Sequence, residues 1–290
     1  MTDAKKLLLF DGLAMAYRGF YAIPGLTTKD GRNTNALMGF IRMMLQLKEA
    51  WKPTHWAVAF DGGRPAERMA VLETYKAQRA PMPDLLREQL PYINEYLDAA
   101  GVPSFRLEKE EADDVMATLA VRAAGEGASV FMATSDKDMF QLVNDRICVV
   151  SPAKDMTCMR AAEVLAKTGV RPDQMVEWQA LIGDSVDNID GVPGVGAKTA
   201  AKWLNEFGSL DEIFRRAQEL KPPRFRELLA QHEPTVRRNL GLMKLRTDLD
   251  IPLNWSDLAV GEGDSSRLLA FFGKYELNSL SRMVQGEFGL

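Results

Sequence analysis

The chain has 290 residues, 46% of them hydrophobic and 26% charged, as expected for a globular protein with a large core and a second, smaller unit. Its two cysteines and two histidines are too few and too irregularly spaced for a disulfide framework or a structural zinc site. The apolar run near the N-terminus, Leu7 to Phe10, is too short for a signal peptide or a membrane span. We therefore expect a cytoplasmic protein with no membrane partner.

Three short apolar runs end in acidic residues. "KKLLLFDG" ends at Asp11, "HWAVAFDGG" at Asp61, and "SVFMATSDKD" at Asp136 and Asp138. Apolar runs of this length, bounded by turn residues, are typical of strands that are buried on both faces of a parallel sheet. In such sheets ligands bind at the carboxyl ends of the strands, so these acids are expected at one functional edge.

Helical patterns lie between these runs and dominate the second half of the chain. "ALMGFIRMMLQLKEAW" follows Asn35, and "PDLLREQLPYINEYLDAAG" ends at a glycine typical of a helix C-terminus. The alternation predicts an α/β fold with a mostly parallel central sheet flanked by helices. After a boundary near "GVRPDQ" strand-like runs largely stop, so we divide the chain into an α/β unit, 1–172, and a helical unit, 173–290. The helices expected after the boundary are Met175 to Ile182, Ala197 to Phe207, Leu210 to Ala217, Arg224 to His232 and Thr235 to Met243.

Another group of acids opens the predicted helix in "EKEEADDVMATLAVRAA". Glu111, Asp113 and Asp114 stand in or beside its first turn, where acids are also common simply because they cap a helix or complement its dipole. This segment alone is equally consistent with helix capping and with a functional role for these acids. Asp11 and Asp61, which precede glycines, could likewise be turn residues.

Taken together, nine carboxylates from five separate segments point to a metal site. At least three of the segments place them at the same edge of the sheet, and so many anions repel one another strongly unless cations are bound. A set of oxygen ligands without His or Cys suits Mg²⁺ or Mn²⁺, and two such ions together are typical of phosphodiester hydrolysis. The nine are Asp11, Asp61, Glu111, Asp113, Asp114, Asp136, Asp138, Asp184 and Asp187.

The net charge of −4 hides a segregation of charge. Without the nine carboxylates the rest of the chain is net positive, so the acidic balance does not exclude a nucleic-acid partner. Basic residues cluster around "YKAQR", and Lys198 and Lys202 follow the glycine-rich loop "GVPGVG". Glycines let a backbone approach a phosphate closely, and the N–H groups that start the helix at Ala197 would point at it.

Six motifs in order closely resemble the 5′→3′ exonuclease domain of bacterial DNA polymerase I and the related bacterial and phage flap endonucleases. They are "LLLFDGLAMAYRGFYA", "GLTTKDGRNTNALMGF", "VAFDGGRPAERMAVLETYKAQRAPMP", "EEADDVMATLA", "ATSDKDMFQLV" and "GDSVDNIDGVPGVGAKTAAKWL". The resemblance runs from about residue 7 to residue 253. Because no polymerase segment follows, we expect a stand-alone member.

The resemblance implies a role for each group. It assigns Asp11, Asp61, Glu111, Asp113 and Asp114 to a first metal position and Asp136, Asp138, Asp184 and Asp187 to a second. It places Lys76 and Arg79 on a helical arch over the site, in contact with the scissile phosphate, and it gives Arg18 another phosphate contact.

The same resemblance implies a helix–hairpin–helix element that grips duplex DNA. The residues matched to DNA contacts are Gly191, Gly194, Gly196, Lys198, Thr199 and Lys202. A K⁺ ion is often held there in the family, and Val192, Val195 and Thr199 match its ligands.

We therefore expect a monomeric, structure-selective 5′ nuclease that acts on DNA with 5′ ends, flaps or branched duplex, using two divalent cations. A PIN-type ribonuclease is the nearest alternative, although that fold is usually shorter and has no hairpin element after the sheet. A branched-DNA binding protein without catalysis is the other, and the presence of all nine acids argues against it.

Overall fold

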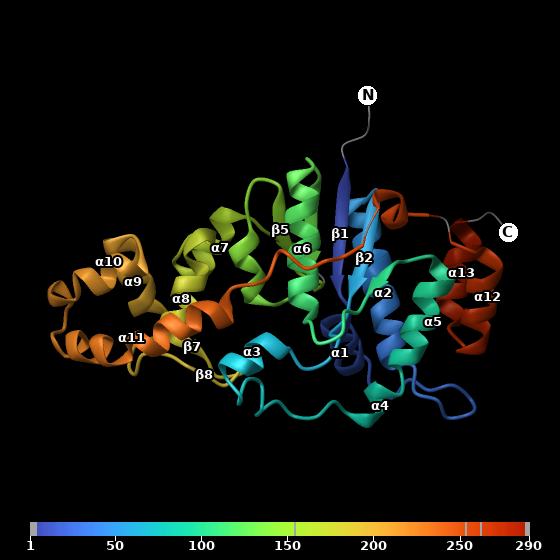
Figure 1. The fold of residues 1–290 in the computed structure, drawn as a ribbon. Coiled ribbons are helices and arrows are strands. Elements are labelled where there is room, and N and C mark those ends of the chain that lie inside the picture. The colour runs from blue at the N-terminus through green and yellow to red at the C-terminus, as the bar shows by residue number, and fades with distance from the viewer. Residues whose placement is uncertain (1–4, 154, 253, 262, 288–290) are drawn as a thin grey trace.

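The computed structural model describes residues 5–153, 155–252, 254–261 and 263–287 (Figure 1). At its centre lies a six-stranded sheet with the order β3–β2–β1–β4–β5–β6, in which every pairing except β5 with β6 is parallel. The mostly parallel sheet expected from the sequence is confirmed. The strands are β1 Lys6–Asp11, β2 His55–Ala59, β3 Ser104–Phe105, β4 Ser129–Ala133, β5 Ile147–Val150 and β6 Cys158–Met159.

The strands are apolar because both faces of the sheet are covered. Along β1, Leu7 and Leu9 enter one hydrophobic core, and Leu8 and Phe10 enter the other. All four side chains are at most 1% exposed, which explains why the strand appears in the sequence as an unbroken apolar run.

Helices cover the two faces unequally (Figure 1). One core packs the sheet against α1 Gly12–Ala22, α2 Asn35–Trp51, α5 Leu90–Ala100, α12 Ser265–Lys274 and α13 Asn278–Glu287. The other face meets α6 Ala112–Gly125, the 3₁₀ helix η1 Lys137–Leu142 and α7 Ala161–Thr168, and it continues into the helical unit.

The helical unit extends from the far end of that second core (Figure 1). Its elements are η2 Pro172–Gln174, α8 Met175–Ile182, α9 Ala197–Phe207, α10 Leu210–Arg215, η3 Ala217–Glu219 and α11 Arg224–Met243. A two-stranded hairpin, β7 Gly183–Asp184 and β8 Ile189–Asp190, connects α8 to the glycine loop.

Our prediction of two helices at 224–232 and 235–243 was wrong, because α11 is continuous through Pro234. A proline inside a helix leaves the carbonyl four residues earlier without its donor. Here Pro234 and Ala230 are both exposed, so water can satisfy that carbonyl.

The last segment of the chain returns to the sheet instead of staying with the helical unit, a difference from the expected 173–290 grouping. Arg122 donates to the Ile251 carbonyl at 2.8 Å, and the Val260 N–H donates to the Thr54 carbonyl at 2.9 Å. After η4 Trp255–Leu258, α12 and α13 pack beside α2 and α5 (Figure 1).

The expected helical arch is only partly helical. It contains α3 Ala66–Val71 and α4 Asp84–Arg87, and turns fill most of the chain between them. Lys76 has a φ of +56°, and Pro81 and Pro83 follow, so this stretch cannot continue as a helix.

Within the part of the chain that the structure describes, no helix is both long enough and apolar enough to cross a membrane.

Candidate active site

Four aspartates meet at the carboxyl edge of the sheet, and within the part of the chain that the structure describes none of them forms a salt bridge. Asp11 ends β1, Asp61 follows β2, Asp136 follows β4, and Asp113 lies in the first turn of α6. Local hydrogen bonds fix three of them: the Ala14 N–H donates to Asp11 and the Ala112 N–H to Asp61, each at 2.9 Å, and the Asp138 N–H donates to Asp136 at 2.8 Å.

The charged forms of Asp11 and Asp113 are disfavoured. Burial, together with the charges of Asp61 and Asp136, raises the pKa of Asp11 to about 6. Burial and the charges of Asp136, Asp11 and Asp61 hold the pKa of Asp113 well above its usual range. Such a cluster favours either a proton or a bound cation.

Asp138 and Asp184 form a second neighbourhood beside the first. Burial and the charge of Asp136 raise the pKa of Asp138 to about 7, although Gln179 donates a hydrogen bond to it. Asp184 pairs with Lys137, whose Nζ lies 2.9 Å from Oδ2. Lys137 stands between Asp136 and Asp138 in the sequence and supplies the local positive charge.

The arch lies directly against Glu111 and Asp187. Lys76 pairs with Glu111, and its Nζ is 3.7 Å from Asp187 Oδ2, while Arg79 Nη2 is 2.5 Å from Asp187 Oδ1. The Tyr75 hydroxyl lies between the two acids, 3.2 Å from an oxygen of each. Lys76 and Arg79 therefore lie against two of the nine acids, and their contact with a phosphate stays a prediction.

Asp114 differs from the other acids because it is fully buried and engaged by Arg68 through both oxygens. The salt bridges divide the acids differently from the two metal positions that the resemblance implies, and those metal positions stay a prediction. Asp136 joins Asp11, Asp61 and Asp113, whereas Glu111, Asp114, Asp184 and Asp187 have cationic side chains as partners.

Among the described residues, no three carboxylate, histidine or cysteine side chains are arranged to hold a metal ion as they stand. Lysine and arginine side chains from the arch and from η1 neutralise four of the nine acids.

Arg18 does not join this group. It lies exposed on α1, and its phosphate contact stays a prediction.

The glycines of the hairpin loop are required for different structural reasons. A Cβ on Gly191 would lie 2.2 Å from the Ile182 carbonyl carbon, so this glycine permits the close packing of β8 against the end of α8. Gly194 has a φ of +75°, and a side chain on Gly196 would meet no atom within 4 Å. Gly194 and Gly196 therefore leave an open, tightly turned backbone at the start of α9.

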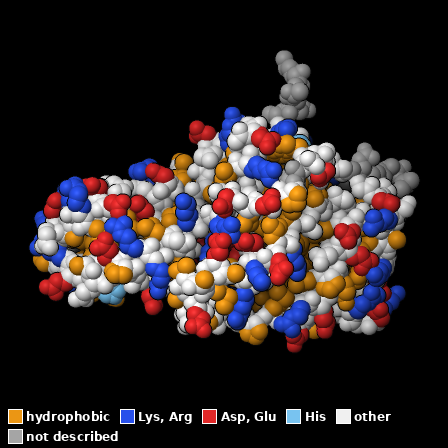
Figure 2. Space-filling view, viewed as in Figure 1, with side chains coloured by type: hydrophobic (Ala, Val, Ile, Leu, Met, Phe, Trp, Pro, Cys, Tyr) orange, Lys and Arg blue, Asp and Glu red, His pale blue; other side chains and the backbone are white. Residues whose placement is uncertain are grey.

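Buried side chains anchor this loop. Val192 and Val195 are 3% and 5% exposed and belong to the core shared with the sheet. Thr199 is partly buried, whereas Lys198 and Lys202 are exposed one turn apart on α9. Figure 2 shows further Lys and Arg side chains over the helical unit, interspersed with acids.

Sequence reasoning missed several side chains that organise the site. Tyr75 precedes Lys76, and Lys137 lies within "SDKD", so their positions beside predicted site residues were available as a signal. Arg68, Gln179 and Arg246 had no such local signal, because their partners are distant in sequence.

Solved structures define the class to which this fold belongs. A phage T5 5′-exonuclease with bound zinc aligns with a TM-score of 0.70 at 24% identity, covering 84% of this chain and 90% of that one. The catalytic core of Rad2 in complex with DNA substrate aligns with a TM-score of 0.64 at 18% identity, covering 97% and 91%. The fold is that of the 5′ nucleases.

The chain belongs to the 5′-3′ exonuclease family. The model of its N-terminal resolvase-like domain matches residues 6–169, and that of its C-terminal SAM fold matches residues 170–266. A 5′-3′ exonuclease of Aquifex aeolicus is 36% identical over 280 residues, covering 97% of this chain and 95% of that protein.

DNA polymerase I proteins are also similar. Those of Bacillus subtilis and Thermus thermophilus are 37% and 41% identical, over 97% and 98% of this chain. The chain spans about a third of the length of these polymerases, 32% and 33%.

Proposed function

We propose that this protein is a structure-selective 5′→3′ exonuclease and 5′-flap endonuclease that hydrolyses DNA phosphodiester bonds with two divalent cations, Mg²⁺ or Mn²⁺. One observation carries the proposal: Asp11, Asp61, Asp113 and Asp136 converge at the carboxyl edge of a parallel sheet, under a basic arch, and form no salt bridge among the described residues. The family membership agrees with this reaction.

The chemistry of the donors fits hard divalent cations. The cluster consists of carboxylate oxygens, and burial makes their shared negative charge unfavourable until a cation is bound. Asp11, Asp61, Asp113 and Asp136 would hold one ion, and Asp138 and Asp184 would contribute to the second. When bound, the ions would supply a water of lowered pKa and positive charge to stabilise the reacting phosphate.

The arch cations would bind and orient the scissile phosphate. Lys76 and Arg79 are held by Glu111 and Asp187, so they are already positioned over the acids. On DNA binding they would donate instead to phosphate oxygens, where they stabilise the charge that develops during cleavage. Arg18, on the exposed face of α1, would contact a phosphate farther along the substrate.

The hairpin loop would grip the duplex away from the cut. Gly194 and Gly196 would allow close approach of a phosphate to the first N–H groups of α9, and Lys198 and Lys202 would add charge without reading sequence. A K⁺ ion bound by the carbonyls of Val192 and Val195 and by Thr199 would strengthen this contact.

A cleavage assay tests the proposal. Labelled 5′-flap duplex, blunt duplex, single-stranded DNA and a structured RNA are incubated with Mg²⁺, Mn²⁺ or EDTA, and the products are sized. We expect cleavage of the flap near its junction and shortening from 5′ ends, with no reaction in EDTA. Tight flap binding without cleavage in either metal would support the non-catalytic alternative, and preferential cutting of RNA would contradict the assignment to DNA.

A further inference from the structure

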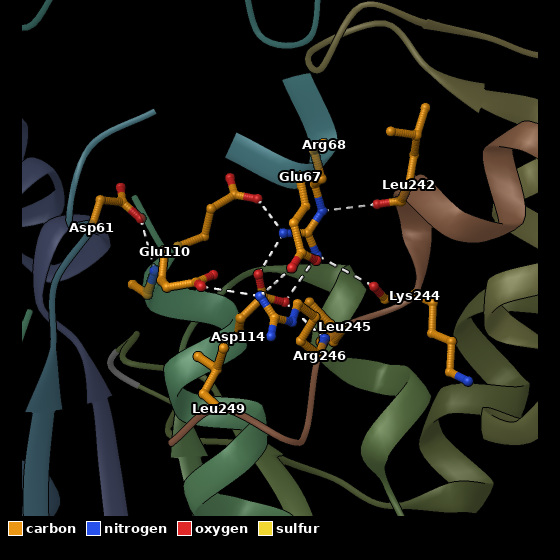
Figure 3. Close-up of polar contacts among 12 residues, drawn as sticks. Asp61, Glu67, Arg68, Glu110, Asp114, Leu242, Lys244, Leu245, Arg246 and Leu249 are labelled. Carbon is orange, nitrogen blue, oxygen red and sulfur yellow. Dashed lines mark hydrogen bonds and ion pairs between the residues drawn. The ribbon is translucent and has the colours of Figure 1, made fainter. Parts of the chain in front are cut away.

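A buried arginine ties together three parts of the molecule that are distant in sequence (Figure 3). Arg68 extends from α3 at the base of the arch and is 8% exposed. It pairs with Asp114, donates to Glu111 Oε2 at 2.6 Å, and donates to the Leu242 and Lys244 carbonyls at 3.1 and 3.3 Å.

Both carboxylate oxygens of Asp114 already accept hydrogen bonds from neighbouring residues. Oδ1 accepts from Arg68 Nη2 and from the Arg246 N–H, each at 2.8 Å, and Oδ2 accepts from Arg68 Nη1. Its side chain is 1% exposed. Asp113, the adjacent residue, instead lies among Asp11, Asp61 and Asp136.

A metal ion could reach Asp114 only by displacing Arg68. That displacement would leave a buried guanidinium without its charge partner, which is strongly unfavourable. Arg68 is also fixed from the other side, since the Leu242 carbonyl lies in the last turn of α11, where helix carbonyls lack intrahelical donors. A cation is favoured at this end of a helix, so Arg68 also caps α11.

A second arginine reinforces the same junction. Arg246, whose N–H bonds Asp114, also places Nη1 2.9 Å from Glu67 and 3.0 Å from Glu110 (Figure 3). Glu67 belongs to α3, and Glu110 lies directly before Glu111, the residue that caps the start of α6. The chain leaving the helical unit is therefore tied to the arch and to the helix that carries Glu111 and Asp113.

We propose that Asp114 is a positioning residue and not a metal ligand: with Arg68 it clamps the start of α6 to the arch and to the end of α11. The clamp sets where Glu111 and Asp113 stand relative to the other carboxylates. It also connects the DNA-gripping helical unit mechanically to the acids. The inference rests on the proposed function, because it concerns which acids hold the cations.

Counting bound Mn²⁺ by electron paramagnetic resonance on the DNA-free protein tests the assignment. We expect Asp114→Asn to bind as many Mn²⁺ ions as the parent at saturation, with affinity reduced by less than about tenfold, the lower end of what loss of an outer contact costs. Asp113→Asn should lose at least one ion. An Asp114→Asn protein that also loses an ion overturns the inference, whereas a parent that binds none contradicts the proposed function instead.

A second variant covers the case in which Asp114→Asn does not fold. The double substitution Arg68→Met with Asp114→Leu replaces the buried pair by apolar groups, an exchange that is often neutral for stability. It should also bind the parental number of Mn²⁺ ions, and loss of an ion would again overturn the inference.

The positioning role has its own measurement. At saturating Mg²⁺, folded Asp114→Asn should cleave about 10–100-fold more slowly in single turnover, as expected when reacting groups shift by about 1 Å. The Mg²⁺ concentration for half-maximal rate should stay close to that of the parent. Arg64→Gln, an exposed arginine on the same segment, is the control for thermal stability. A parental rate in folded Asp114→Asn would contradict positioning and leave Asp114 with a purely structural role.

Discussion

Asp113 and Asp114 are adjacent in the sequence and lie in opposite electrostatic environments. Successive residues of a helix point about 100° apart, so one side chain reaches the acids at the sheet edge and the other reaches Arg68. Asp113 lies among other carboxylates, whereas Asp114 is paired with the guanidinium of Arg68. Residue type alone therefore does not determine the role of a carboxylate in this site.

We predict that Asp113→Asn stabilises the metal-free protein and abolishes cleavage. The pKa of Asp113 is raised in the fold, so its ionised form opposes folding at neutral pH, and removing the charge relieves that cost. A gain of about 1 kcal/mol would raise the thermal midpoint by about 2–4 °C. Asp190→Asn, at an exposed position, is the control and should leave the midpoint unchanged. A lower midpoint for Asp113→Asn would contradict the crowded-anion interpretation.

Lys76→Ala should reduce turnover more than DNA affinity. A cation on the reacting phosphate contributes most when charge develops there, so we expect a loss of about 100-fold or more in single-turnover rate. Lys76→Arg, which keeps the charge, should recover part of it. Quench-flow rates at saturating enzyme, together with flap affinity measured in Ca²⁺, separate the two effects. If only affinity falls, Lys76 is an ordinary surface contact.

At the scale of elements, the arch and the β7–β8 hairpin hold each other in place. The Asn188 side chain donates to the Thr74 carbonyl and accepts from Gln78, each at 2.9 Å, and the Lys76 N–H donates to the Asp187 carbonyl at 3.0 Å. These contacts replace the hydrogen bonds that a continuous helix would have made. The hairpin thereby brings Asp187 to the arch, while the loop that follows β8 leads into α9.

Replacing both Lys198 and Lys202 by Ala should weaken binding similarly for flaps of any sequence. Each lost phosphate contact lowers the slope of log K against log salt by roughly 0.9, so two contacts would change it by about 1.8. Flap titrations over a range of KCl concentrations, in Ca²⁺ to prevent cutting, measure this slope. Cleavage at saturating enzyme should persist.

A double variant of matched charge serves as the control. Lys5→Ala with Lys274→Ala removes two lysines from the amino edge of the sheet and from α12, away from the hairpin (Figure 1). It should leave the salt slope unchanged. Equal slopes for the two double variants would mean that the α9 lysines do not touch phosphate.

At the scale of the whole molecule, the end of the chain completes the core of the α/β unit. Leu268, Phe271 and Phe272 of α12 are buried in the same cluster as α2 and α5. An extended segment carries the chain from α11 across the sheet to reach them (Figure 1). Stability of the catalytic unit therefore depends on residues that follow the helical unit in sequence.

Phe272→Ala should destabilise the whole protein even though it is far from the acids in sequence. The side chain is 1% exposed, and truncating a buried Phe costs about 3–5 kcal/mol in the free energy of unfolding. Urea unfolding measures this loss. Leu165→Ala, at a position 43% exposed on α7, should cost far less. A similar small effect for Phe272→Ala would mean that α12 is not part of the cooperative core.

Much of this protein was determined by local sequence. The apolar runs of β1, β2 and β4 and the acids that end them follow from burial on both faces of a parallel sheet, and the glycine loop and the bounds of α9 follow from turn and helix signals. The motifs also sufficed to predict the family. These features depend on residues close together in the chain, where periodicity and turn chemistry act directly.

Only the tertiary structure decided which acids are paired and where the last helices pack. Arg68 and Asp114 are 46 residues apart, and Arg246 and Asp114 are 132 apart, so no local pattern could join them. The sequence of an amphipathic helix such as α12 indicates that one face is apolar, but it does not indicate which hydrophobic core that face packs against. Pairing and docking depend on long-range packing, because the partner of a charge or of an apolar face is set by the fold that brings distant segments together.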